Sequence, residues 1–183
     1  MANKENLILT AVGPDRIGLV EQISEFIVKH GCNIEDSKMA VFCGEFALIL
    51  LLSGPPQGLQ KIADAQREIE SQTDLTIWFK APASRKPAES FLPYRLTAAC
   101  MDHPGVVYKL SHMLSKLGIN IESMETKTYA APVSGTPIFR LEALISVPAT
   151  LTINDLRARF DDIQREENID IELSLVFDPS KSF

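Results

Sequence analysis

Histidine, serine and cysteine are among the residue types whose side chains can act as catalysts or, for histidine and cysteine, bind a metal ion. The histidines His30, His103 and His112 share no spacing that places two of them beside a carboxylate pair on one helical face. Ser24 and Ser111 lack the Gly-x-Ser-x-Gly turn of a nucleophile. No G-x-G-x-x-G or Walker sequence occurs either. We therefore predict a non-enzymatic protein with no catalytic residue, metal site or cofactor.

The cysteines and the N-terminus indicate a cytoplasmic protein. Cys32, Cys43 and Cys100 are an odd number without Cys-x-x-Cys spacing, which is typical of reduced, packed thiols. The first residues lead into a short apolar segment and show no secretory signal pattern. No apolar run approaches the roughly 20 residues that a membrane-spanning helix needs, so we expect no membrane contact.

The charge of the chain argues against direct contact with nucleic acid. Eighteen basic and 24 acidic residues give a formal net charge of −6. A phosphate backbone repels such a chain unless its basic residues cluster, and no cluster is present. Neither half contains a helix-turn-helix pattern. We therefore expect the protein not to bind DNA by itself.

An internal repeat divides the chain into two domains. Shifting the sequence by 87 residues aligns Asp15 with Asp102, and 12 of the 27 positions from Leu9 to Glu35 are identical without a gap. Shared secondary structure alone does not produce such identity, so the two halves should share a fold. Between them, residues 81–91 are rich in proline, small and charged residues, which is typical of a linker. We predict domains at residues 1–80 and 92–183.

Each half predicts the same order of elements: strand, helix, two strands, helix, strand. The first strands are expected at residues 6–12 and 94–100. Spacings of 3, 4 and 3 predict one buried face on each first helix, formed by Val20, Ile23, Ile27 and His30 and by Val107, Leu110, Leu114 and Leu117. The second helices show the same spacing at Leu59, Ile62, Gln66 and Ile69 and at Ile153, Leu156, Phe160 and Ile163.

The connections between these elements select the fold. Strands at 33–42 and 45–52 are joined by a tight Cys43-Gly44 turn, whereas the second half has a longer connection over residues 131–137. Short connections and right-handed crossovers favour a four-stranded antiparallel sheet with both helices on one face. The predicted class is α+β, with two ferredoxin-like βαββαβ domains.

The two sheets should differ on the face that the helices leave open. Ile49, Leu51 and Trp78 form an apolar set there in the first unit, whereas the second unit has Glu172 or Ser174 opposite Trp78. Because a contiguous apolar set is rarely left in water, we expect the other unit or a second subunit to cover this face. A homodimer is one arrangement that would do so.

Two repeated motifs resemble the ACT domain. The first is Asp-x-x-Gly opening a helix, and the second is Gly-x-Asn-Ile opening the next strand. They occur as Asp15-Arg16-Ile17-Gly18 and Asp102-His103-Pro104-Gly105, and as Gly31-Cys32-Asn33-Ile34 and Gly118-Ile119-Asn120-Ile121. Pro104 matches the family's common proline, whereas Ile17 replaces it in the first half.

The whole chain, with two such units and an extended second hairpin, is similar to the tandem-ACT repressors of glycine cleavage genes. This resemblance implies a corepressor that senses a small amino acid, glycine, and acts through a partner transcriptional activator. The alternative is a regulatory subunit that senses an amino acid for a metabolic enzyme.

The resemblance also implies a ligand site on each unit. Its residues are Asp15, Ile17, Gly18 and Asn33 in the first unit and Asp102, Pro104, Gly105 and Asn120 in the second. Helix N–H groups would bind the ligand carboxylate and side-chain oxygens its ammonium, where two units adjoin. The alternative is that the aspartates only cap helices and the asparagines only satisfy turn backbone.

Overall fold

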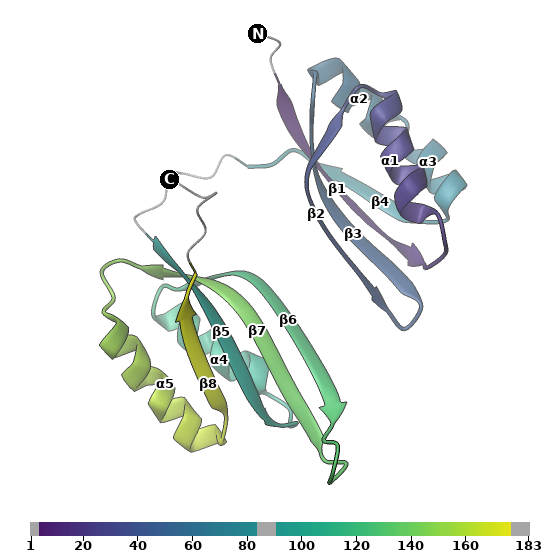
Figure 1. Cartoon of the computed structure of the whole chain (residues 1–183). Helices are drawn as coiled ribbons and strands as arrows, with labels where there is room; N and C mark the ends of the chain where they lie inside the picture. Colours follow the sequence, from purple (N-terminus) through teal and green to yellow (C-terminus); the bar gives the residue numbers. More distant parts are fainter. Residues whose placement is uncertain (1–3, 84–90, 177–183) are drawn as a thin grey trace. The chain divides into compact units, whose positions relative to one another are not determined.

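A computed structural model of the chain describes residues 4–83 and 91–176 (Figure 1). The chain forms two compact units, residues 1–85 and 86–183. Most of the predicted linker, residues 84–90, lies outside the described residues, and Phe91 already begins a strand. The limits proposed for the linker and the two domains therefore stay a prediction.

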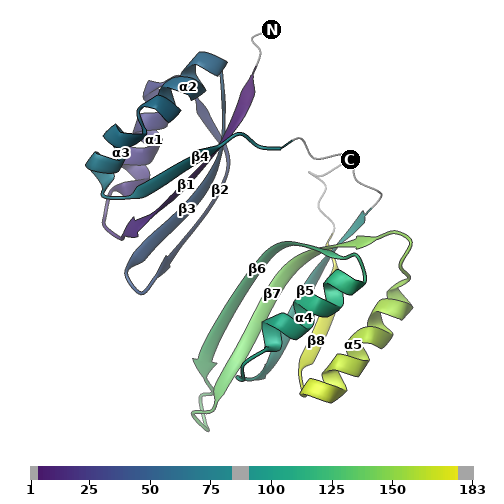
Figure 2. The ribbon, with the colours of Figure 1, turned by 180° about the vertical axis from the view of Figure 1, so that it is seen from behind.

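The first unit is a four-stranded antiparallel sheet in the order β2-β3-β1-β4. Its helices cover one face, as Figures 1 and 2 show from opposite sides. The elements are β1 Glu5–Pro14, α1 Leu19–Lys29, β2 Asn33–Phe42, β3 Glu45–Gly54, α2 Pro56–Asp64, α3 Gln66–Thr73 and β4 Thr76–Lys80.

The second unit repeats this topology in the order β6-β7-β5-β8. The elements are β5 Phe91–Met101, α4 Val106–Lys116, β6 Asn120–Ala130, β7 Pro137–Pro148, α5 Ile153–Glu167 and β8 Asp170–Leu175. The predicted α+β class and the ferredoxin-like fold of both units are confirmed.

One predicted helix is two helices. In the first unit α2 ends at Asp64 and α3 begins at Gln66, whereas α5 of the second unit is continuous. The buried ring of Phe160 lies in the predicted apolar face of α5, where the first unit has Gln66. The Gln66 side chain instead donates a hydrogen bond to the carbonyl oxygen of Ile77 on β4, 2.8 Å away.

The buried face of α1 is rotated from the predicted one. Leu19, Ile23, Phe26 and Ile27 are buried, whereas Val20 is 49% exposed and His30 only partly buried. Both sets have helical spacing, so apolar periodicity alone did not select between them. On α4 the predicted Leu110 and Leu114 are buried, and Val106 replaces the predicted Val107.

Both hairpins form where predicted, although Pro137, the last residue of the predicted second connection, already begins β7. Cys43 and Gly44 have φ angles of 51° and 85°, the left-handed pair that a two-residue hairpin turn requires. The longer connection between β6 and β7 is closed by a hydrogen bond of 2.8 Å from the Ala131 amide to the Thr136 carbonyl.

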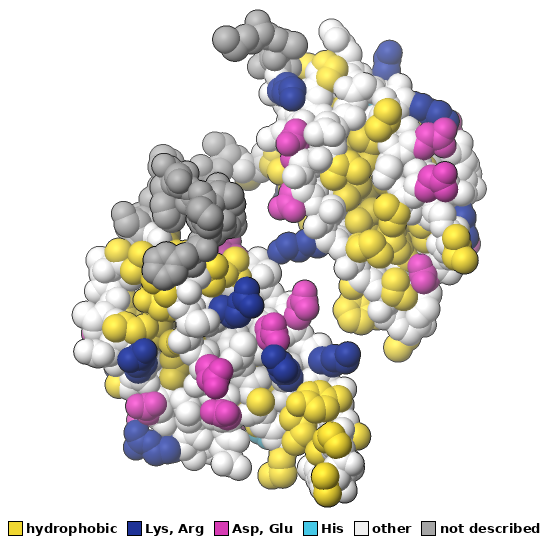
Figure 3. All heavy atoms as spheres, in the orientation of Figure 1, with side chains coloured by type: hydrophobic (Ala, Val, Ile, Leu, Met, Phe, Trp, Pro, Cys, Tyr) yellow, Lys and Arg dark blue, Asp and Glu magenta, His cyan; other side chains and the backbone are white. Residues whose placement is uncertain are grey.

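The open sheet faces differ as the sequence predicts. Thr10 pairs with both Ile49 and Trp78, so the three form one row across the first sheet. Ile49 is 46% and Trp78 55% exposed within the chain. The corresponding row of the second sheet contains Glu142 and Glu172, and Figure 3 shows charged side chains of both signs over that unit. That the first face is covered in an assembly stays a prediction.

No helix among the described residues is long and apolar enough to cross a membrane.

Candidate functional site

The loop between the first strand and the first helix is held in the same way in both units. The Asp15 amide donates a hydrogen bond of 2.8 Å to the carbonyl oxygen of Gly44, at the tip of the β2–β3 hairpin. The Asp102 amide donates one of 2.9 Å to the carbonyl oxygen of Pro137, at the base of the β6–β7 connection. Each loop is thus fixed against the neighbouring hairpin, which leaves the aspartate side chains exposed.

Each of these helices begins with a glycine in the left-handed region. Gly18 has φ 94° and Gly105 φ 100°, and both stand at the N-cap position. No side chain of the described residues accepts a hydrogen bond from these helix starts. Asp15 and Asp102 therefore do not cap the helices, so that alternative is wrong.

The uncapped helix starts present free backbone amides. The first amides of a helix have no partner within it, and the helix dipole places positive potential at this end. A ligand carboxylate is the kind of group that such amides bind. Gly18 and Gly105 have no described atom within 4 Å of the place where a Cβ would stand, so a ligand can approach the backbone closely.

The two loops carry different side chains between the aspartate and the glycine. Ile17 is fully exposed, and Pro104 of the second unit is also exposed. Arg16 donates hydrogen bonds to the Gln22 side chain at 2.7 Å and to the Gln72 carbonyl at 2.9 Å. A fixed positive charge therefore lies beside the first loop. Sequence reasoning missed it, although a basic residue directly after Asp15 was a visible signal.

Asn33 and Asn120 bind glutamates rather than turn backbone. The Asn120 side-chain amide donates to Glu122 Oε1 at 2.7 Å, and the Ser146 hydroxyl donates to the same oxygen at 2.8 Å. In the first unit Asn33 donates to Glu35 at 3.4 Å, and Ser53 also donates to Glu35. The alternative that the asparagines satisfy turn backbone is thus not what the structure shows.

This Asn-Glu-Ser cluster lies at a β-bulge in both sheets. The register shifts between Ile34 and Asp36, and between Ile121 and Ser123, so each glutamate is the extra residue of its strand. The hydrogen bond from Ser53, and then that from Asn33, lower the pKa of Glu35. The repeated Asn-x-Glu sequence was the only signal of the cluster, because the serines come from distant strands.

Ser53→Ala should raise the pKa of Glu35 toward its ordinary value. The hydroxyl hydrogen bond favours the charged carboxylate, and its loss removes the largest cause of the lowered pKa. A carboxyl group whose pKa is lower in the folded than in the unfolded state stabilises the fold at pH values above the unfolded pKa. That stabilisation is lost as the pH falls through the folded pKa. The variant should therefore lose less stability on acidification. An NMR titration of Glu35 tests this, and an unchanged pKa would contradict the role of Ser53.

The structure does not bring the predicted aspartate and asparagine together within a unit. Asn33 pairs with Ser53 at one end of β3, whereas Pro14, which precedes Asp15, pairs with Glu45 at the other end. At about 3.3 Å per residue, the two ends are roughly 26 Å apart. The second unit has the same arrangement, since Asn120 pairs with Ser146 and Met101 with Ile138. A small ligand bound within one unit can touch only one of the two positions.

Two of the three cysteines are buried in the cores of the units. Burial raises the pKa of the Cys32 thiol, and burial followed by the charge of Asp102 raises that of Cys100. Both buried thiols are therefore protonated at neutral pH. Within residues 4–83 and 91–176 there is no group of three or more metal-binding side chains.

The first unit is similar in sequence to a known domain family. Residues 5–80 match the family model described as the ACT domain. The second unit repeats the topology, the left-handed glycine and the uncapped helix of the first. The first unit therefore matches the ACT-domain family, and the second unit has the same fold.

Three comparisons show similarity over nearly the whole chain. The chain is 24% identical over 176 residues to the glycine cleavage system transcriptional repressor of Escherichia coli strain K12. The aligned residues cover 96% of this chain and 93% of that protein. A crystal structure of an unknown protein from Galdieria sulphuraria has a TM-score of 0.79 and 27% identity, over 96% of this chain and all of that one. A structure assigned as a glycine cleavage system transcriptional repressor has a TM-score of 0.72 at 22% identity, over 97% of this chain and all of that one, and supports the fold alone.

Proposed function

We propose that this protein is a non-enzymatic transcriptional corepressor that responds to a small amino acid. Its full-length similarity to the Escherichia coli repressor supports a regulatory role. The observation that carries the ligand response is the repeated loop, in which a left-handed glycine opens an uncapped helix. Glycine is the proposed ligand, and the cytoplasm the proposed location.

The ligand would bind with its carboxylate at the first amides of α1 or α4. The exposed carboxylate of Asp15 or Asp102 stands in the same loop and would attract the ammonium group. Ile17 and Pro104 would line the loop from outside. Asn33 and Asn120 lie at the opposite end of each sheet, so they would complete such a site only as residues of a second unit.

A DNA-binding activator is the proposed partner, because the chain itself carries a net charge of −6. The second candidate is a regulatory subunit of a metabolic enzyme. The two units of the described chain are compatible with both candidates. The full-length similarity to a repressor favours the corepressor.

Copurification separates the two candidates. The tagged protein should recover a transcriptional activator from cells of its source, in amounts that change when glycine is added. Recovery of a metabolic enzyme in place of an activator would favour the regulatory subunit. If the activator is recovered in the same amount with and without glycine, the proposed response to glycine is wrong, whereas the corepressor role remains supported.

The purified protein alone should not shift duplex DNA at physiological salt. Its charge opposes binding to phosphates, and binding through phosphate contacts weakens further as salt rises. An electrophoretic shift assay with the promoter region of glycine cleavage genes tests this, with the same DNA plus the copurified partner as the positive control. A specific shift by the protein alone would contradict action through a partner.

A further inference from the structure

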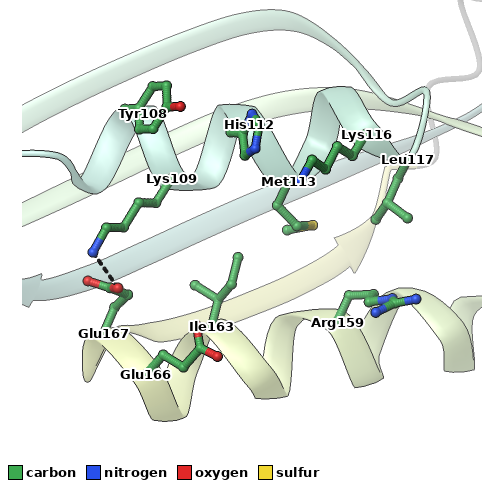
Figure 4. Close-up of a pocket in the computed structure, with 10 residues that line it drawn as sticks. All are labelled: Tyr108, Lys109, His112, Met113, Lys116, Leu117, Arg159, Ile163, Glu166 and Glu167. Carbon is green, nitrogen blue, oxygen red and sulfur yellow. Dashed lines mark hydrogen bonds and ion pairs between the residues drawn. The ribbon is translucent and has the colours of Figure 1, made fainter.

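A groove of about 540 Å³ lies between α4 and α5 of the second unit (Figure 4). Met113, Leu117 and Ile163 give it an apolar lining, and charged side chains stand along both helices. None of the predicted ligand residues lines it. It is therefore separate from the loops to which the proposed amino-acid response belongs.

The first unit fills the corresponding space with aromatic rings. Phe26 stands where the repeat places Met113, and it is buried at 6% exposure. Its ring lies 4.7 Å from that of His30, the counterpart of Leu117. Ile163 is only partly buried, whereas its counterpart Ile69 is fully buried. The groove thus arises from smaller or more flexible side chains in the second unit.

The repeat also changes the charges around the groove. In the first unit Lys29 forms an ion pair of 2.9 Å with Glu25, one helical turn before it. The second unit has His112 at that earlier position, so Lys116 lacks the equivalent carboxylate. The alignment that pairs Ile69 with Ile163 also pairs Ala65 of the first unit with Arg159. Neither cation has a hydrogen bond or an ion pair with another described residue.

The two ends of the groove differ in charge. Lys116 on α4 and Arg159 on α5 belong to the same half of the groove, with their side chains running in different directions (Figure 4). At the other end Lys109 forms an ion pair with Glu167, and Glu166 adds a further carboxylate. Two helical turns separate the ends, which is about 10 Å at 1.5 Å per residue. Both positive charges at the first end are therefore unpaired among the described residues, whereas the one cation at the other end, Lys109, is paired.

We propose that this groove binds a small organic monocarboxylate with an apolar body. Its carboxylate would pair with Lys116 and Arg159, whose planar guanidinium suits a carboxylate. Its body would lie along Met113, Leu117 and Ile163, away from water. An α-amino acid fits less well, because its ammonium group would stand beside the same two cations.

Octanoate is a suitable probe, since its chain has about the length of the groove, and 1-octanol has the same body without the charge. The full-length protein should bind one octanoate, at least about tenfold more tightly than octanol, as followed by calorimetry and by the NMR signal of the Met113 methyl group. Lys116→Gln and Arg159→Gln should each weaken octanoate binding about tenfold, because each removes a charge-assisted contact. Lys29→Gln, at the matching position of the first unit, should leave it unchanged.

Met113→Phe supplies the side chain that fills this space in the first unit and should abolish binding. The two glutamine variants change exposed side chains, so they test the proposal even if that variant folds poorly. Absence of octanoate binding, equal affinity for octanol, or equal effects of Lys116→Gln and Lys29→Gln would overturn the proposal. None of these results bears on glycine binding.

Discussion

Leu9→Ala is expected to destabilise the first unit by about 2 to 5 kcal/mol and to leave the second unit unchanged. Leu9 is fully buried in a core whose members all belong to the first unit. Its repeat counterpart Leu96 is fully buried in the separate core of the second unit. Truncating either side chain removes apolar contacts and leaves a cavity in one core only.

The single tryptophan makes the two transitions separable. Trp78 lies in β4, so its fluorescence reports unfolding of the first unit. In a denaturant titration Leu9→Ala should lower the fluorescence midpoint, whereas Leu96→Ala should lower only the circular dichroism transition of the second unit. A fall of the fluorescence midpoint in Leu96→Ala as large as that in Leu9→Ala would show that the two units unfold as one.

Gly18→Val and Gly105→Val, combined in one chain, should weaken glycine binding at least tenfold. A β-branched residue at φ near 100° costs about 1 to 3 kcal/mol, and the loop can relieve that strain only by changing its backbone. Because no described atom stands near the new Cβ positions, the strain is conformational rather than a clash. The amides that would bind the carboxylate then leave their positions. Calorimetry with glycine measures the loss.

Gly135→Val is the matched control for this variant. Gly135 also has a positive φ, 69°, with no described atom within 4 Å of the added Cβ. It lies in the hairpin connection and not at a helix start. Gly135→Val should lose about as much stability as one of the two substitutions does, while keeping glycine affinity. If the control weakens glycine binding as much as the double variant does, the effect is general destabilisation and the loops are not the site.

The fold was predictable because the same spacings occur twice. The duplicated Asp-x-x-Gly and Gly-x-Asn-Ile motifs fixed where helices begin and strands resume. Cys43-Gly44 fixed a hairpin through the backbone angles it adopts. Each of these features depends only on residues that are close together in the sequence. The rotation of α1 was not predictable, because both Val20 and Leu19 are apolar and only packing against the sheet selects between them.

The site was less predictable, since its geometry depends on register and on the spacing of helices. The pairing of Asn33 with Ser53 separates that asparagine from Asp15 by the length of the sheet. No local pattern contains that information. The serine hydroxyls bound to Glu35 and Glu122 likewise come from strands that are distant in sequence.

Calorimetric titration of the wild-type protein with glycine, acetate and methylamine tests the central claim most directly. A site that satisfies both charges of a zwitterion binds each half more weakly, because one of its charged groups then stays unpaired. The account predicts saturable heat with glycine and at least tenfold weaker binding of acetate and of methylamine. Absence of heat with glycine, or acetate binding as tight as glycine binding, would contradict an amino-acid-responsive regulator.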